Sequence, residues 1–408
     1  MASEWEQVPL GDVITLQRGF DLPSQDRKPG KVPIVSSSGV SDYHSEVGVK
    51  GPGVVTGRYG TIGQVFLVKE DYWPLNTTLW VKDFHGNDPQ FASYLLRTVD
   101  FRSCSDKSSV PGVNRNDLHR IPVLLPPLAE QKAIAAVLGA LDDKIECHRR
   151  MNATLEAMAR ALFQSWFVNF DPVRAKLDGR QPTGLDPATA ALFPATFQDS
   201  PLGPIPHGWT VGKIKDCCTH IQNGGTPRRN ESRFWNDGDI PWLTSGEVRQ
   251  PIVTTPQNFI TEAGLAESSA KWIPPLSTVI ALYGATAGQV SLVSSRLTTN
   301  QAVCGLVPKK HFAFFNYLWM RAATGELENK AVGSAQQNIS KGIVEETQVV
   351  LAPLPLVEKF ADSVGLLFDH WISNLHQSRT LAALRDALLP KLLSGELSVR
   401  GAATAAIV

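Results

Sequence analysis

Amide and guanidinium side chains gather at glycine-containing turns of this 408-residue chain. The densest group lies in the segment Gln222-Asn223-Gly224-Gly225-Thr226-Pro227-Arg228-Arg229-Asn230. Side chains of these types can form paired hydrogen bonds with the edges of guanine and adenine, or they can grip phosphate groups. The segment therefore favours recognition of nucleic acid over the making or breaking of a covalent bond.

Similar side chains occur at turns in both halves of the chain. In the first half we select as candidate DNA-binding residues Arg18, Arg27, Lys28, Arg58, Tyr59, Asn114 and Arg115. In the second half we select Gln222, Asn223, Arg228, Arg229, Asn230, Ser245, Tyr283, Gln336, Gln337, Asn338 and Lys341. Exposed Asn and Arg are common in loops, so a bystander role is the alternative for each residue. Their recurrence at matching places strengthens the joint hypothesis.

The sequence repeats itself over its whole length. Trp5 and Gly19 return about 204 residues later as Trp209 and Gly224, and the Tyr59-Gly60 turn returns as Tyr283-Gly284. At a constant offset of 224, Asn76 would match Asn300 and Asn114 would match Asn338. Two like modules suit a target that has two parts, and DNA with two half-sites is the leading candidate.

The modules must position these turns with short strands and few helices. Apolar runs at 33–35, 53–56 and 64–68 predict strands, and the apolar spacing in 91–99 predicts a helix. The second half repeats this pattern with strands at 278–282 and 290–293 and a helix at 312–323. We therefore predict an α/β fold of two mixed domains. The expected boundaries are 1–122 and 206–350 for the domains, 123–165 and 351–398 for two spacer helices, and 166–205 for a Pro/Gly-rich linker that packs through its aromatic residues.

Each half ends in a long helix with a coiled-coil seam. The first seam runs from Ile134 to Leu162 in steps of four and three, and the second runs from Val364 to Leu388. Both seams turn polar near the middle, at His148 and Asn152 and at Asn374 and Ser378. An antiparallel pair would let these polar groups satisfy one another and fix the register. The alternative is that His148 and Asn152 face solvent. We expect the residues after the second helix, near Ser394, to return to the first module near Glu4.

Motifs of catalysis are missing from the sequence. There is no phosphate-binding loop, no Gly-x-Ser-x-Gly elbow and no Asn-Pro-Pro-aromatic tetrapeptide of amino-methyltransferases. Cys217 and Cys218 are adjacent and lack a second ligand pair, so buried strand cysteines are favoured over a metal site. We expect a protein without catalysis, metal or cofactor of its own.

The composition fits a soluble two-domain protein. Apolar residues make up 43% of the chain, which excludes wholesale disorder, and the formal net charge is zero. A neutral chain lacks the broad basic surface of a non-specific DNA coater. Five unpatterned cysteines and the absence of a long apolar run predict a cytoplasmic protein without membrane segments.

The sequence closely resembles the specificity subunit of type I restriction-modification systems. The stretches that carry the resemblance are the openings at Trp5 and Trp209, 240–247, Pro126-Pro127-Leu128-Ala129-Glu130-Gln131, 141–146, 165–170 and 388–397. The second helix start departs from the motif, because Leu354 aligns with a proline and Lys359 with a glutamine.

The resemblance implies two target recognition domains that each read one half of a split DNA sequence, with the two helices as a ruler. It also implies two methyltransferase subunits that bind S-adenosylmethionine for adenine methylation, and two restriction subunits that hydrolyse ATP. Residues Ala133, Ala136, Val137 and Ala140 on the first helix are the candidate partner contacts. An enzyme with an unrecognised motif and a scaffold that binds only proteins are the alternatives.

Overall fold

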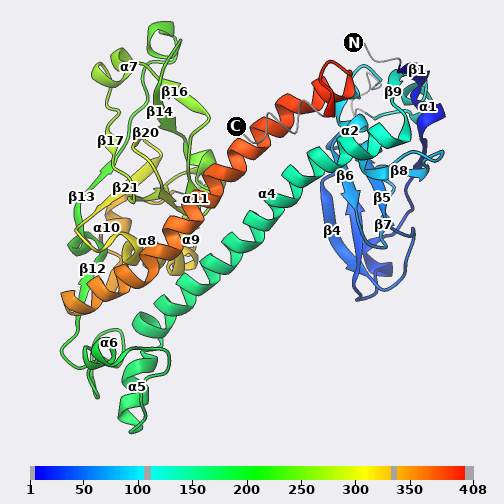
Figure 1. Ribbon diagram of the computed structural model, residues 1–408. Coiled ribbons are helices and arrows are strands. Elements are labelled where there is room, and N and C mark those ends of the chain that lie inside the picture. The colour runs from blue at the N-terminus through cyan, green and yellow to red at the C-terminus, as the bar shows by residue number, and fades with distance from the viewer. Residues whose placement is uncertain (1–4, 105–111, 332–337, 400–408) are drawn as a thin grey trace. The chain divides into compact units, whose positions relative to one another are not determined.

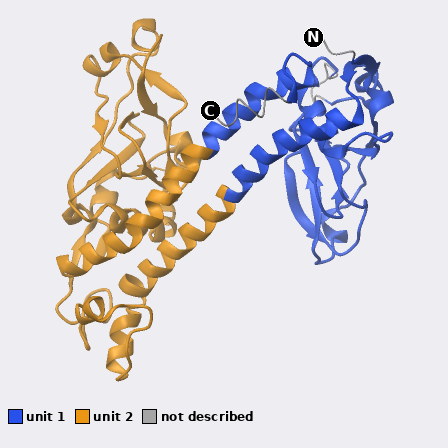
Figure 2. Ribbon diagram, viewed as in Figure 1, with its two compact units in different colours: residues 1–147, 378–408 blue, residues 148–377 orange. Residues whose placement is uncertain are grey.

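The chain folds into two compact units. Each of its two long helices has one half in unit 1 and the other half in unit 2. The computed structural model describes residues 5–104, 112–331 and 338–399. Unit 1 combines residues 1–147 with 378–408, and unit 2 contains residues 148–377 (Figure 2). The long helices are α4 (Leu128–Phe163) and α11 (Leu354–Leu393), and each passes from one unit into the other (Figure 1).

Unit 1 contains two small sheets and a two-stranded ribbon. Its strands are β1 (Glu6–Pro9), β2 (Thr15–Arg18), β3 (Val32–Ser36), β4 (Gly39–His44), β5 (Gly53–Gly57), β6 (Val65–Val68), β7 (Trp73–Pro74), β8 (Thr78–Asp83) and β9 (Pro122–Leu125). The strand orders are β2-β8-β5-β6, β4-β3-β7 and β1-β9. Its short helices are α1 (Leu10–Val13), η1 (Ser24–Asp26), α2 (Pro89–Thr98) and α3 (Arg115–Leu118). Asp88 caps α2 by accepting a hydrogen bond from the Phe91 amide, and Pro89 stands in the first turn, where no amide donor is needed.

Unit 2 repeats this topology with additions. Its strands are β10 (Phe197–Gln198), β11 (Ile205–Pro206), β12 (Thr210–Lys213), β13 (Cys218–Asn223), β14 (Ile240–Leu243), β15 (Ile252–Val253), β16 (Asn258–Ile260), β17 (Trp272–Ile273), β18 (Thr278–Ala281), β19 (Val290–Val293), β20 (Leu297–Thr299), β21 (Val303–Pro308) and β22 (Gln348–Leu351). The order β13-β21-β18-β19-β15 extends the pattern of β2-β8-β5-β6 by one strand. The order β16-β14-β20-β17 likewise extends β4-β3-β7, and β12-β22 matches β1-β9. The predicted repeat of a mixed α/β plan is confirmed.

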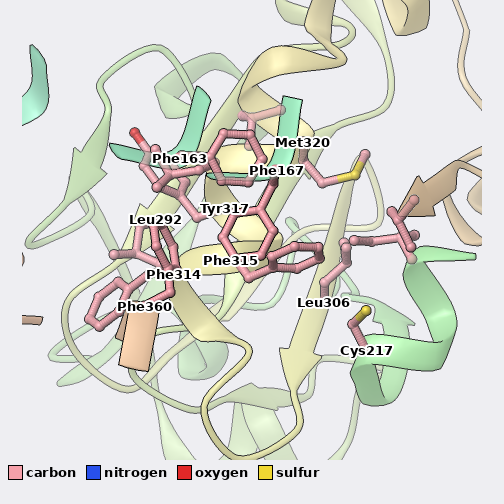
Figure 3. Packing of buried hydrophobic residues seen from close by; sticks show 14 of the residues in the cluster. Phe163, Phe167, Cys217, Leu292, Leu306, Phe314, Phe315, Tyr317, Met320 and Phe360 are labelled. Atoms are coloured by element: carbon pink, nitrogen blue, oxygen red, sulfur yellow. The ribbon is translucent and has the colours of Figure 1, made fainter. Parts of the chain in front are cut away.

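The helices of unit 2 cover its sheets and close its core. They are η2 (Gln164–Val168), α5 (Asp171–Leu177), α6 (Pro187–Ala191), η3 (Ile214–Cys217), η4 (Ser232–Phe234), η5 (Ser245–Glu247), α7 (Glu262–Ala266), η6 (Gly284–Thr286), α8 (Ala313–Ala322), α9 (Thr324–Ala331) and α10 (Lys341–Glu345). Phe163 at the end of α4 and Phe167 of η2 meet Phe315 of α8 and Phe360 of α11 (Figure 3). The linker belongs to this core, because Phe170 and Phe193 are also buried in it.

The long helices pair antiparallel within each unit. In unit 2 the Asn374 side-chain amide donates to the Asn152 amide oxygen at 2.9 Å, and both residues are buried. His148 is only 2% exposed, so the alternative in which His148 and Asn152 face solvent is wrong. In unit 1 Arg385 of α11 donates to Asp142 of α4 at 2.6 Å. Asp142 also accepts hydrogen bonds from Tyr94 and Arg97 of α2.

The start of the second long helix shows that the predicted alignment of the two helix starts is wrong. Amides of Glu130 and Gln131 donate to the Pro127 carbonyl, and amides of Leu356 and Val357 donate to the Pro353 carbonyl. Pro353 is therefore the equivalent of Pro127, and the match of Gln131 with Lys359 is wrong by two residues. Buried Gln131 bonds to Asn87 and to the Asp88 amide, whereas its true equivalent is the apolar Val357.

The C-terminal end of the second helix returns to the first module as expected. Glu4 lies outside the described residues, but its neighbour Trp5 packs against the core of unit 1, and so does Leu397. Within the described ranges, no helix is both long and apolar enough to cross a membrane.

Candidate nucleic-acid interface

Five candidates of the first module line one cavity of about 400 Å³. They are Arg18, Arg58, Tyr59, Asn114 and Arg115, and they come from the end of β2, the end of β5 and the start of α3. The amides of Arg58 and Tyr59 both donate to the Thr77 carbonyl, and the Val113 amide donates to the Arg58 carbonyl. These bonds join three segments that are far apart in the sequence.

The cavity wall combines charge with an aromatic face. The Arg58 guanidinium carbon lies 4.6 Å from the centre of the Tyr59 ring, a cation–π arrangement. Gly112 lies against the same ring, and a Cβ atom there would come within 2.2 Å of it. Asn114 caps α3 by accepting a hydrogen bond from the Asn116 amide. Its side-chain oxygen therefore stabilises the start of this helix.

Arg18 is balanced by a carboxylate at the cavity. Its guanidinium lies 2.9 Å from Asp21, and Asn76 donates to the same carboxylate. The hydrogen bond from Asn76, together with the bond and charge of Arg18, lowers the pKa of Asp21, and desolvation opposes this only in part. Both charged side chains are about half exposed, so this pair contributes little stability.

Arg27 and Lys28 do not line this cavity. Arg27 lies 3.1 Å from Asp42 of β4, and Lys28 lies 2.9 Å from Glu46 just beyond that strand. The backbone amide of Tyr43 and the guanidinium of Arg27 lower the pKa of Asp42. Both cations are therefore compensated beside the β3–β4 hairpin, in a group separate from the other five residues.

The Arg228 loop of the second module consists of residues 224–231, between β13 and η4. Two tryptophans form hydrogen bonds with its backbone. The indole nitrogen of Trp242 donates to the Gly225 carbonyl at 2.9 Å, and that of Trp235 donates to the Arg228 carbonyl at 3.0 Å. Arg228, Arg229 and Asn230 are all exposed on this loop. Gln222 and Asn223 lie at the end of β13 before it, and the Gln222 amide donates to the Trp272 carbonyl.

Ser245 and Tyr283 are neighbouring candidates. Thr286 follows Tyr283 and donates its hydroxyl to the Ser245 carbonyl at 2.9 Å. Tyr283 remains 40% exposed. In the first module Ser37 lies near the turn at Tyr59, as Ser245 lies near the turn at Tyr283. A Cβ atom on Gly60 would lie 3.3 Å from the Ser37 hydroxyl. Sequence reasoning missed Ser37, which the matching registers of β3 with β7 and of β14 with β20 make the equivalent of Ser245.

Lys341 has a structural role that the sequence did not indicate. Its ammonium group donates to the Ile221 carbonyl at 3.0 Å and pairs with Glu345 at 3.1 Å, which ties α10 to β13. Asn338 is exposed and its backbone forms a bridge with Tyr283. Gln336 and Gln337 lie outside the described residues.

The constant offset of 224 is wrong beyond the tyrosine turns. Gly112 bridges Tyr59 as Asn338 bridges Tyr283, so Gly112 is the equivalent of Asn338, and Asn114 matches the helix cap Ser340. The Leu75 amide bonds Val35 as the Asn300 amide bonds Leu243, so Asn76 and Asn300 are not equivalent either. The turn at Tyr283 has one residue more than the turn at Tyr59, which changes the offset to 225 at Asn300, and a second extra residue before Asn338 changes it to 226.

The candidate partner residues on α4 have mixed exposure. Ala136 and Ala140 are exposed, whereas Ala133 is half-buried and Val137 packs against the core of unit 1. The buried thiols of unit 2 are suited to packing, because burial raises the pKa of Cys217 and of Cys218 to about 12. Among the described residues no group of three His, Cys, Asp or Glu side chains could hold a metal ion.

Comparison with known proteins identifies both modules. Residues 2–157 and 206–362 each match the family described as the type I restriction modification DNA specificity domain. The chain belongs to this family. It is a DNA specificity subunit of the type I restriction-modification class with two such domains.

Relatives of this specificity subunit occur in Haemophilus influenzae and Methanocaldococcus jannaschii. It is 27% identical to the type I restriction enzyme HindI specificity subunit of Haemophilus influenzae, over 76% of this chain and 77% of that one. It is 25% identical to the MjaIX specificity subunit of Methanocaldococcus jannaschii, over 90% and 82%. The crystal structure of the type I restriction-modification S subunit from M. genitalium has the same fold, with a TM-score of 0.61, 15% identity and 96% of both chains covered.

Proposed function

We propose that this specificity subunit reads a split DNA target, with one half-site bound by each module. The observation that carries the proposal is that each match to the DNA specificity domain falls on a module with its own core and its own polar loops. In the first module the loops form the cavity of Arg18, Arg58 and Arg115. In the second they centre on Arg228 and Arg229.

The chain acts without catalysis of its own in this proposal. It directs two methyltransferase subunits, which bind S-adenosylmethionine and methylate adenine, and two restriction subunits, which hydrolyse ATP. The exposed Ala136 and Ala140 on α4 offer a flat apolar contact for such a partner. A net charge of zero gives few released counterions on DNA binding, which is consistent with partners that supply part of the positive field.

A binding experiment with and without partners tests this proposal. The purified chain should bind duplex DNA weakly and show no methyltransferase or nuclease turnover, whereas its complex with the methyltransferase subunits should bind a split target tightly and methylate it. Titration of labelled duplexes and transfer of a labelled methyl group give both readouts. Nanomolar affinity of the isolated chain for DNA would contradict the dependence on partners.

A further inference from the structure

Most of the cations on the candidate DNA-binding loops of the two modules form ion pairs with carboxylates. The pairs are Arg18 with Asp21, Arg27 with Asp42, Lys28 with Glu46, Arg228 with Glu231 and Arg233 with Glu267. Arg229 is held in a different way. It makes no ion pair with any residue that the structure describes, and it is exposed. The N–H donors of its guanidinium therefore remain available to an acceptor outside the chain.

Two tryptophans hold the Arg229 guanidinium in place. Its central carbon lies 4.2 Å from the ring centre of Trp235 and 4.8 Å from that of Trp242. The two rings meet edge to face at 5.1 Å. A guanidinium that packs against aromatic rings keeps its N–H donors for other acceptors, and these donors match a bidentate acceptor.

The same tryptophans fix the backbone on which Arg229 stands. Their indole nitrogens bind the carbonyls of Gly225 and Arg228, the residues that bracket the loop before Arg229. Trp242 is buried in β14, and a Cβ atom on Gly225 would come within 2.1 Å of Ser269, so the loop lies close against the module. A side chain fixed in this way loses little freedom on binding.

Arg228 has the opposite environment although it is adjacent. Its guanidinium lies 2.8 Å from Glu231, which also pairs with Arg233, and Arg233 forms a fork with Glu267 at 2.7 and 2.6 Å. An acceptor on DNA that bound Nη1 of Arg228 would have to compete with Glu231 for this donor. Arg228 is thus part of a charge network that holds the loop.

We propose that Arg229 reads a guanine of the second half-site, by donating two hydrogen bonds to its O6 and N7 atoms in the major groove, and that Arg228 does not read a base. Arginine with these two acceptors is the commonest base-specific contact of proteins with DNA. This inference rests on the proposed function and assigns one base-reading residue within it.

Matched single variants test the assignment. The chain with Arg229→Ala, Arg228→Ala or Arg229→Lys is produced with its methyltransferase subunits, and the methylated sites of the host DNA are mapped by sequencing. Arg229→Ala should lose the preference for one G·C pair in the second half-site by about 5- to 150-fold. The first half-site should stay unchanged, which shows that the complex has assembled. Arg228→Ala should keep the full target, and Arg229→Lys should not restore the lost preference, because lysine has no planar fork.

Three results would overturn the assignment. Arg229→Ala could leave the whole target intact, or Arg228→Ala could relax the same base pair. Arg229→Ala could also weaken binding to all sequences equally and lower the salt dependence by about one charge, which is the behaviour of a phosphate contact. If the unaltered chain gave no split target, the proposed function itself would be wrong, and this outcome is distinct from the other three.

Discussion

At the scale of residues, the two modules present their polar groups in different ways. The first gathers three arginines around one cavity, whereas the second fixes one arginine on two tryptophans. Arg58 and Arg115 line that cavity, and neither forms an ion pair with a carboxylate among the described residues, in contrast to Arg18. Their chemistry suits a phosphate of the DNA backbone.

Removal of these two arginines should lower the salt dependence of binding. With Arg58→Ala and Arg115→Ala together, the slope of log K against log salt should fall by about two, at roughly one per phosphate contact. Sequence preference should change little. Arg120→Ala is the matched control, because Arg120 is 81% exposed near α3 and does not line the cavity. An unchanged slope in the double variant would remove the cavity from the DNA interface.

Asp142 is expected to stabilise unit 1 more than its exposed neighbour Asp143. Asp142 accepts hydrogen bonds from Tyr94, Arg97 and Arg385, so Asp142→Ala should cost about 2–3 kcal/mol of unfolding free energy. Asp143 pairs with Lys69 at the surface, so Asp143→Ala should cost less than about 1 kcal/mol. Urea denaturation of both variants gives the comparison, and equal losses would argue against the buried network.

The contribution of Asp142 should also depend on pH. Burial raises its pKa, but the hydrogen bonds from Arg385 and Tyr94 and the nearby arginine charges outweigh burial, so the net pKa is lowered. A lowered pKa gives stability above the unfolded value of about 3.9, and this stability is lost as the pH falls through the folded value. The stability difference between the protein and Asp142→Asn should therefore be constant from about pH 5 to 8 and shrink below about pH 4. A difference that grew on acidification would contradict this sign.

At the scale of elements, polar contacts in the helix pair define its register. The Asn374 side-chain amide donates to the Asn152 amide oxygen, and both residues are buried where the seam turns polar. Asn374→Leu alone leaves a buried amide without its partner and should cost about 1–3 kcal/mol, whereas replacement of both by leucine should cost less than the sum of the single changes. A double-mutant cycle by urea unfolding measures this coupling, and additive losses would mean that the two amides do not depend on each other.

Sequence patterns predicted the positions of helices and strands more accurately than they predicted which residues of the two halves are equivalent. The strands at 53–56 and 290–293 and both long helices followed from apolar spacing, because burial of one face determines that spacing. The predicted equivalences failed because one extra residue in the turn after Tyr283, and a second one before Asn338, shifted the count. The different environments of Arg228 and Arg229 could not be predicted, since they depend on where Trp235, Trp242 and Glu231 meet in space.

At the scale of the whole molecule, the repeated modules and continuous helices suit a target of two half-sites with a gap of set length. The 36 residues of α4 extend over about 54 Å at ~1.5 Å per residue, or about one and a half turns of duplex at ~34 Å per turn. One added base pair in the gap turns a half-site by about 34–36°. Methylation of duplexes with such a changed gap should be abolished, and unaffected methylation would show that the helices do not set the spacing.

The most direct test of the two-module reading is a map of methylated adenines in a host that makes this chain with its methyltransferase subunits. We predict one new target made of two short specific parts, separated by a non-specific gap of constant length. The Arg58→Ala and Arg115→Ala double variant should weaken methylation of this target without altering its bases, whereas Arg229→Ala should relax one base pair in one part only. A continuous target, or a methylation pattern that does not change when the chain is present, would contradict the account.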